Sequence, residues 1–78
     1  MEFQVDISQA RWRKASDVNR EYALFELILE DKILLDVGFS DDEVLEIAFH
    51  EGIANSISDW NGFFEALSTG RKLAEADK

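Results

Sequence analysis

The stretch EYALFELILEDKILLDVGFSDDEVLEIAFH, residues 21–50, decides the fold, because apolar and polar side chains alternate along most of it. Alternation with a period of two is typical of β-strands, whose successive side chains point to opposite faces of a sheet. Short polar segments interrupt the pattern twice, which favours an antiparallel meander with tight connections. The sequence predicts strands at residues 21–30, 33–39 and 43–50, joined at Asp31-Lys32 and at Ser40-Asp41-Asp42.

The two faces of this predicted sheet differ in polarity. The inner face is uniformly apolar, and its members are Phe25, Leu27, Leu29, Ile33, Leu35, Val37, Phe39, Leu45, Ile47 and Phe49. The outer face interleaves carboxylates with aliphatic side chains, namely Glu26, Glu30, Asp36 and Glu46 with Leu24, Ile28, Leu34 and Val44. Such a mixed face could bind a basic protein or pair with a second copy of the chain. Alternatively, solvent or the amino-terminal segment around Trp12 covers it.

A helix is predicted downstream of the meander, where apolar residues recur at spacings of three and four. Ser58 could cap its first turn, with Ser56 as a competing cap, and Gly70 would end it. The tail, residues 70–78, would then fray or form a second short helix. The helix would cover the apolar sheet face with Trp60, Phe64 and Leu67. The apolar residues that define the stripe are Ile53, Ile57, Trp60, Phe64 and Leu67.

The amino-terminal part of the chain gives a weaker pattern. Residues 2–8 alternate and predict a strand, whose pairing partner stays open, while residues 9–20 are expected to form a loop or a short helix. No proline, repeat or low-complexity segment divides the chain, so residues 1–78 are expected to form a single domain. The predicted fold class is α+β: an antiparallel meander of three to four strands with a carboxyl-terminal helix packed on one face, a two-layer sandwich.

Charge and composition narrow the possible functions. The formal net charge is −9, and the excess lies in residues 21–59, which carry eleven carboxylates against Lys32 alone. This field would repel nucleic acid and anionic membrane, and it would attract a basic protein partner; simple solubility is the alternative explanation. The chain contains no cysteine and one histidine, which excludes disulfides and multi-histidine zinc sites. Without a signal-like start, the expected location is cytoplasmic.

Three smaller features of the sequence could carry chemistry. Asp41-Asp42-Glu43 could collect calcium, but the alternating ligand loop is missing and a solvated turn is favoured. His50 beside Glu51 could act as a general base, but an incidental histidine at a strand end is favoured. The basic run around Trp12 could bind a nucleic-acid backbone, but pairing with the protein's own carboxylates is favoured. We therefore expect no enzyme activity, no cofactor and no metal. The residues of that run are Arg11, Trp12, Arg13 and Lys14.

The segments ILLDVGFSDDEVLEIAFHEG, DWNGFFEAL and GRKLAEAD, within residues 33–77, resemble small acidic bacterial immunity proteins of toxin–immunity systems. The resemblance implies a protein that binds and blocks a cognate toxin through an acidic surface. The alternative is a small homo-oligomeric structural or assembly protein, which would pair through Leu24, Ile28, Leu34 and Val44. The partner-binding residues that the resemblance implies are Glu26, Glu30, Asp36, Asp41, Asp42, Glu43 and Glu46.

Overall fold

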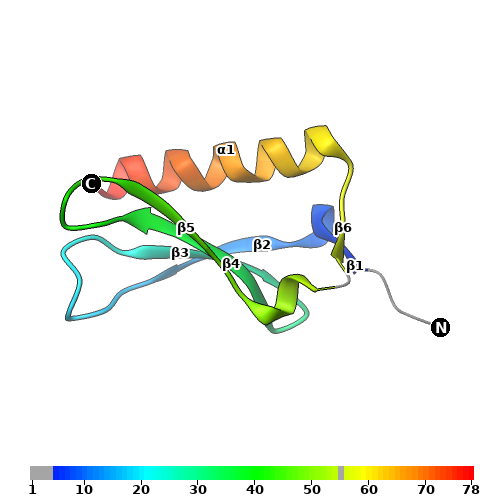
Figure 1. The fold of residues 1–78 in the computed structure, drawn as a ribbon, viewed down its shortest axis with the longest axis horizontal. Helices are drawn as coiled ribbons and strands as arrows, with labels where there is room; N and C mark the ends of the chain where they lie inside the picture. Colours follow the sequence, from blue (N-terminus) through cyan, green and yellow to red (C-terminus); the bar gives the residue numbers. More distant parts are fainter. Residues whose placement is uncertain (1–4, 55) are drawn as a thin grey trace.

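The computed structural model describes residues 5–54 and 56–78. A four-stranded antiparallel sheet of order β2-β3-β4-β5 forms one layer, and the helix α1 forms the other (Figure 1). The predicted α+β meander with a carboxyl-terminal helix is confirmed. The elements are β1 Val5–Asp6, the short 3-10 helix η1 Ile7–Gln9, β2 Arg11–Ala15, β3 Leu24–Leu29, β4 Lys32–Phe39, β5 Leu45–Phe49, the 3-10 helix η2 Glu51–Ile53, β6 Ser56–Ile57 and α1 Trp60–Asp77.

The fourth strand of the sheet is β2, so the prediction of a loop or short helix over residues 9–20 is wrong for Arg11–Ala15. Its alternation is hard to see in the sequence because Trp12 is its only large apolar residue. An edge strand with one face in solvent needs few apolar anchors. Trp12 lies opposite Leu27 of β3 and belongs to the periphery of the core.

The predicted amino-terminal strand ends earlier than expected, at Asp6 rather than Ser8, and its residues 2–4 lie outside the described part of the chain. β1 pairs in parallel with β6, with Val5 opposite Ser56 and Asp6 opposite Ile57. The chain then turns into η1, where Asp6 accepts a hydrogen bond from the Ser8 amide and Ile7 enters the core. This small second ladder lies at the end of the molecule where α1 begins (Figure 1).

The hairpin between β3 and β4 explains which leucines are buried. Its two turn residues are Glu30 and Asp31, one position earlier than predicted, and both have positive φ (50° and 66°). The pairing register shifts beside Leu27, so Leu34 is an extra residue in β4. Such a bulge turns two consecutive side chains toward one layer. Leu34 and Leu35 therefore both lie in the core, and Ile33, predicted to face inward, pairs with Ile28 instead.

The helix differs from the prediction at both ends. Asp59, rather than Ser58 or Ser56, caps it by accepting a hydrogen bond from the Gly62 amide at 2.8 Å. Gly70 does not end the helix, which continues to Asp77. A Cβ atom at Gly70 would lie 2.5 Å from the ring of Trp12, so this glycine lets α1 approach β2. Gly70 is a packing contact in the middle of the helix.

The core lies between α1 and the two central strands. α1 packs mainly on β3, β4 and η1, through the half-buried Phe63, Leu67 and Leu73 and the buried Ala74. Trp60 and Phe64, predicted to cover the sheet, are not part of this core and are exposed. The buried hydrophobic side chains are Ile7, Phe25, Leu27, Ile28, Leu29, Leu34, Leu35, Val37 and Ala74.

Candidate functional site: an open sheet edge with an acidic rim

The strand β5 forms one edge of the sheet, and half of its backbone groups face away from the protein. The ladder to β4 continues beyond both ends of β5, where Ser40 donates to the Val44 carbonyl and His50 donates to the Leu34 carbonyl, each at 2.9 Å. In an antiparallel ladder these directions alternate along the strand. The N–H and C=O groups of Leu45, Ile47 and Phe49 therefore point to the open side.

The same three residues direct apolar side chains toward the helix layer, since they lie opposite Phe39, Val37 and Leu35. α1 does not cover them. We define the β5–α1 patch as five large apolar residues whose exposed fractions are 37% for Leu45, 41% for Ile47, 62% for Phe49, 85% for Trp60 and 64% for Phe64.

A groove runs between β5 and α1 through the middle of this patch. Leu45 and Ile47 form its strand side, Phe64 and Leu67 its helix side, and Val37 its floor. Because β5 and α1 run in roughly opposite directions (Figure 1), Phe49 and Trp60 extend the two sides toward the same end. Trp60 and Phe64 share a face of the helix because they are four residues apart. The patch thus forms an apolar strip along β5 and the first turns of α1, and we call it the apolar strip.

Carboxylates lie beside the strand half of this strip, whereas Arg71, paired with Glu75, borders the groove on the helix side. Asp41, Asp42 and Glu43 occupy the β4–β5 turn, Glu46 lies on the outer face of β5, and Glu51 follows the strand. Every residue from Asp41 to Glu51 is exposed. Of these carboxylates, Glu43 pairs with Lys78 at 3.3 Å. Desolvation, together with the charges of Glu21 and Glu43, raises the pKa of Tyr22 above its ordinary value. We call the carboxylates of Asp41, Asp42, Glu43, Glu46 and Glu51 the acidic rim.

Fewer side chains on the outer face of the sheet are free to bind a partner than the sequence indicates. Glu26 pairs with Arg13, and Asp36 lies 2.7 Å from the ring of His50, so two of the four predicted outer-face carboxylates have partners within the protein. Ile28 is buried and Leu34 belongs to the core, so neither can form the predicted oligomer or partner face. Leu24 is half-buried, and Val44 is exposed.

Four of the seven predicted partner-binding residues come together at the start of β5, namely Asp41, Asp42, Glu43 and Glu46. Glu30 lies in the β3–β4 turn, at the other end of β4. Sequence analysis missed the patch because it placed Leu45, Ile47, Phe49, Trp60 and Phe64 in the core. Element widths could have indicated it. One helix is about 10–12 Å wide, and four strands about 4.8 Å apart are wider than that, so a single helix cannot cover the whole sheet face.

The basic run lies on β2, where its residues have partners inside the protein. Arg13 donates to Glu26 at 2.7 Å, and Lys14 lies 2.6 Å from Asp77 at the end of α1. Hydrogen bonds from Lys14 and from the Ala23 amide lower the pKa of Asp77 below its ordinary value. Trp12 is half-buried under Gly70, so its ring is not presented for base stacking.

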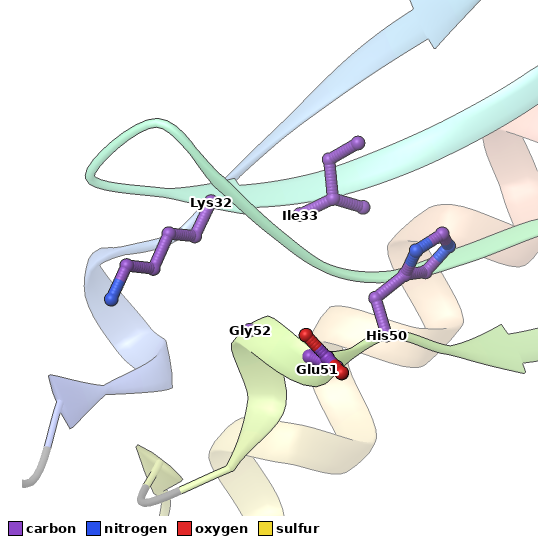
Figure 2. Close-up of a pocket in the computed structure, with 5 residues that line it drawn as sticks. All are labelled: Lys32, Ile33, His50, Glu51 and Gly52. Atoms are coloured by element: carbon purple, nitrogen blue, oxygen red, sulfur yellow. The ribbon is translucent and has the colours of Figure 1, made fainter.

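A shallow hollow lies beside His50, between η2 and the start of β4 (Figure 2). Lys32, Ile33, His50, Glu51 and Gly52 line it. Figure 2 shows the Lys32 side chain extending away from His50, whose ring pairs with Asp36. A Cβ at Gly52 would lie 2.5 Å from the Ile33 carbonyl oxygen, so the glycine permits η2 to approach β4. The titratable side chains of this hollow do not converge on a common point.

Two further findings concern the described residues. Among residues 5–54 and 56–78, no three His, Cys, Asp or Glu side chains lie together in a group that could hold a metal ion. Within the same part of the chain, no helix has the length and apolar character required to cross a membrane.

Comparisons with known proteins add no assignment. No protein-family model matches the chain, and neither a curated protein nor a solved structure matches it. The resemblance to immunity proteins therefore stays a prediction, and the geometry of the open edge is the basis for a functional proposal.

Proposed function

We propose that this chain is a non-enzymatic protein-binding domain that binds a basic protein through the β5–α1 patch and its acidic rim. One observation carries the proposal: the segment Asp41–Glu51 is exposed throughout, although it contains the apolar strand residues Leu45, Ile47 and Phe49. Contiguous exposed apolar side chains bordered by charge are typical of protein interaction sites. Burying one such side chain completely is worth about 1.5–3 kcal/mol, so covering the strip would be favourable.

The charge of the site favours a basic partner. The rim contributes five carboxylates. Among the described residues, the ion pair that involves the rim joins Glu43 to Lys78. Positive potential on a partner would accelerate association and fix its orientation, and added salt would weaken both effects. The apolar strip would supply affinity that salt does not screen.

Toxin neutralisation is the specific form of this proposal that the sequence resemblance supports. A toxin that acts on nucleic acid needs a basic surface, and a domain with an acidic rim could cover that surface. A toxin would bind through the same β5–α1 patch and the same acidic rim as any other basic protein.

A homodimer is the second candidate, and the sequence of β5 favours it. If two β5 strands paired antiparallel about Ile47, Leu45 would face Phe49 of the other copy and Glu46 would face Ala48. Glu46, the one charged residue of β5, would then not lie opposite Glu46 of the other copy. Each end of the paired strands would, however, bring the acidic β4–β5 turn of one copy near Glu51 of the other, which places like charges together.

Selection from a displayed library of random dodecapeptides tests the proposed function. The wild-type protein should enrich peptides that carry lysine or arginine together with apolar residues. These peptides should lose binding to the double variant F49S/F64S, whose net charge is unchanged. Val18→Ser is the matched control, because Val18 is fully exposed in the loop between β2 and β3.

Two results would contradict the proposal. Equal enrichment by wild type and by F49S/F64S would show that the patch is not the binding surface. Selection of acidic peptides would show that the rim does not determine the partner's charge. Circular dichroism of each variant checks that the fold is intact.

A further inference from the structure

The β5 edge has few of the devices by which proteins usually prevent strands from adding to a sheet. Such devices include proline, charged side chains (lysine above all), short edge strands, bulges and covering loops. The strand Leu45–Phe49 contains no proline, lysine or arginine, its one charged residue is Glu46, and its register with β4 is regular. The outward backbone groups of Leu45, Ile47 and Phe49 are therefore arranged as a template for another strand.

We propose that the partner binds by strand addition: an extended segment of a basic protein pairs antiparallel with β5 and becomes the fifth strand of the sheet. This inference rests on the proposed function, and it adds the binding mode and the sequence pattern of the partner. Backbone hydrogen bonds along an exposed edge supply affinity in this mode, and alternate side chains supply specificity.

The geometry of β5 determines that pattern. In an antiparallel pair, residues directly opposite each other share a face of the sheet. Partner residues opposite Leu45, Ile47 and Phe49 would form the backbone hydrogen bonds and would direct their side chains toward α1. They would contact the β5–α1 patch, so they should be apolar. Partner residues between them would lie on the outer face.

The outer face determines the residue type at those intervening positions. Glu46 forms no ion pair with any residue in the described part of the chain, and its neighbour Ala48 is small. Arg20 lines the same hollow as Glu46, but its guanidinium donates to the carbonyls of Tyr22 and Phe39 at 3.2 and 3.0 Å. A lysine or arginine opposite Glu46 would pair with a carboxylate that is otherwise free. The partner segment should therefore alternate apolar and basic residues.

Charge also favours a foreign basic strand over a second copy. A second β5 strand would bring another acidic rim to the same edge, with the acidic β4–β5 turn of each copy near Glu51 of the other. A segment of alternating apolar and basic residues would neutralise the rim and cover the same apolar strip.

Synthetic peptides distinguish strand addition from other modes of binding. The probe is the fluorescently labelled peptide Lys-Val-Lys-Val-Lys-Val-Lys, compared with one version N-methylated at the three valine amides and another N-methylated at three lysine amides. In antiparallel pairing the valine amides face β5 and the lysine amides face solvent. Valine methylation should weaken binding at least about tenfold, because three backbone hydrogen bonds are lost. Lysine methylation should change the affinity by less than about threefold, since it removes none of them.

Three outcomes overturn the strand-addition mode. They are equal tolerance of both methylations, a larger loss from lysine methylation, and a dimer in light scattering that the peptide does not dissociate. If one of these outcomes is found while the unmodified peptide still binds wild type and loses affinity for Phe64→Ser, the proposed function stands while the binding mode fails. If the peptide does not bind and the displayed library yields no patch-dependent sequence, both fail.

Discussion

The two edge strands of the sheet, β2 and β5, differ in whether α1 covers their aromatic residue. On β2, Trp12 lies beneath Gly70 of α1, and basic side chains occupy most of the rest of the strand. On β5, Phe49 has the corresponding orientation toward the helix layer, but no helix covers it. A single helix can cover only part of a four-stranded sheet; α1 packs on β3 and β4 and also meets Trp12 of β2 at Gly70, but it leaves the β5 side chains exposed. The comparison shows that helix placement, rather than strand composition, determines which edge stays open.

The largest expected difference between the two edges is in stability, when Trp12 or Phe49 is replaced by alanine. Trp12→Ala should lower the free energy of unfolding by about 2–4 kcal/mol, slightly below the loss for a fully buried aromatic. Phe49→Ala should change it by less than about 0.5 kcal/mol, because the ring is mostly in solvent. Urea unfolding followed by circular dichroism measures both. Similar losses for the two variants would mean that β5 is covered in solution, for example by a second copy.

Filling the close approach should damage the β2 side alone. Gly70→Val places a branched side chain against Trp12 and should destabilise the protein by about 1–3 kcal/mol, as overpacking does. Thr69→Val is the matched control, because Thr69 is exposed on the same helical turn. Binding of a peptide selected on the wild type should survive in whatever fraction of Gly70→Val remains folded. If Gly70→Val were as stable as wild type, the close approach would not fix the position of α1.

The smallest expected effect concerns the ion pair that joins β2 to the end of α1. Because the pKa of Asp77 is lowered in the folded protein, its carboxylate stabilises the fold above the ordinary aspartate pKa. That contribution should decline as the pH falls below about 4, the ordinary aspartate pKa, and should be lost below the lowered pKa of the folded state, where the carboxylate becomes protonated. Asp77→Asn should therefore flatten the fall in stability between about pH 4 and pH 2, measured by thermal unfolding at each pH. Glu75→Gln, which removes a carboxylate from an exposed pair with Arg71, is the control. An unchanged pH profile in Asp77→Asn would remove Asp77 from this role.

The meander could be predicted from the sequence because β3 and β4 alternate apolar and polar residues and bury half or more of their residues. The β2 strand could not, since Trp12 alone marks its inner face. Gly70 was misread as a helix end because glycine usually has that role, and only the position of the Trp12 ring reveals its packing role. The bulge at Leu34 is likewise invisible in the sequence, where Leu34 and Leu35 fit either face.

The candidate site was half predictable for a similar reason. The acidic residues of the β4–β5 turn are polar in any arrangement, so their exposure followed from the sequence alone. The apolar residues of β5 were correctly expected to face the helix layer. Whether α1 reaches them depends on where the helix crosses the sheet, which no local pattern in β5 specifies.

The short β1–β6 ladder has a consequence for the order in which the protein folds. The four sheet strands are neighbours along the chain, so each pairing closes a short loop. The pairing of Val5 with Ser56 closes a loop that contains the entire sheet, and it gains only two residues of ladder. Loop-closure entropy rises with loop length, so this ladder should form last and open first. Hydrogen exchange should be faster at the Ile57 amide than at the Leu35 amide. The first turn of α1, which carries Trp60, would then be the part of the binding strip with the greatest freedom to adapt to a partner.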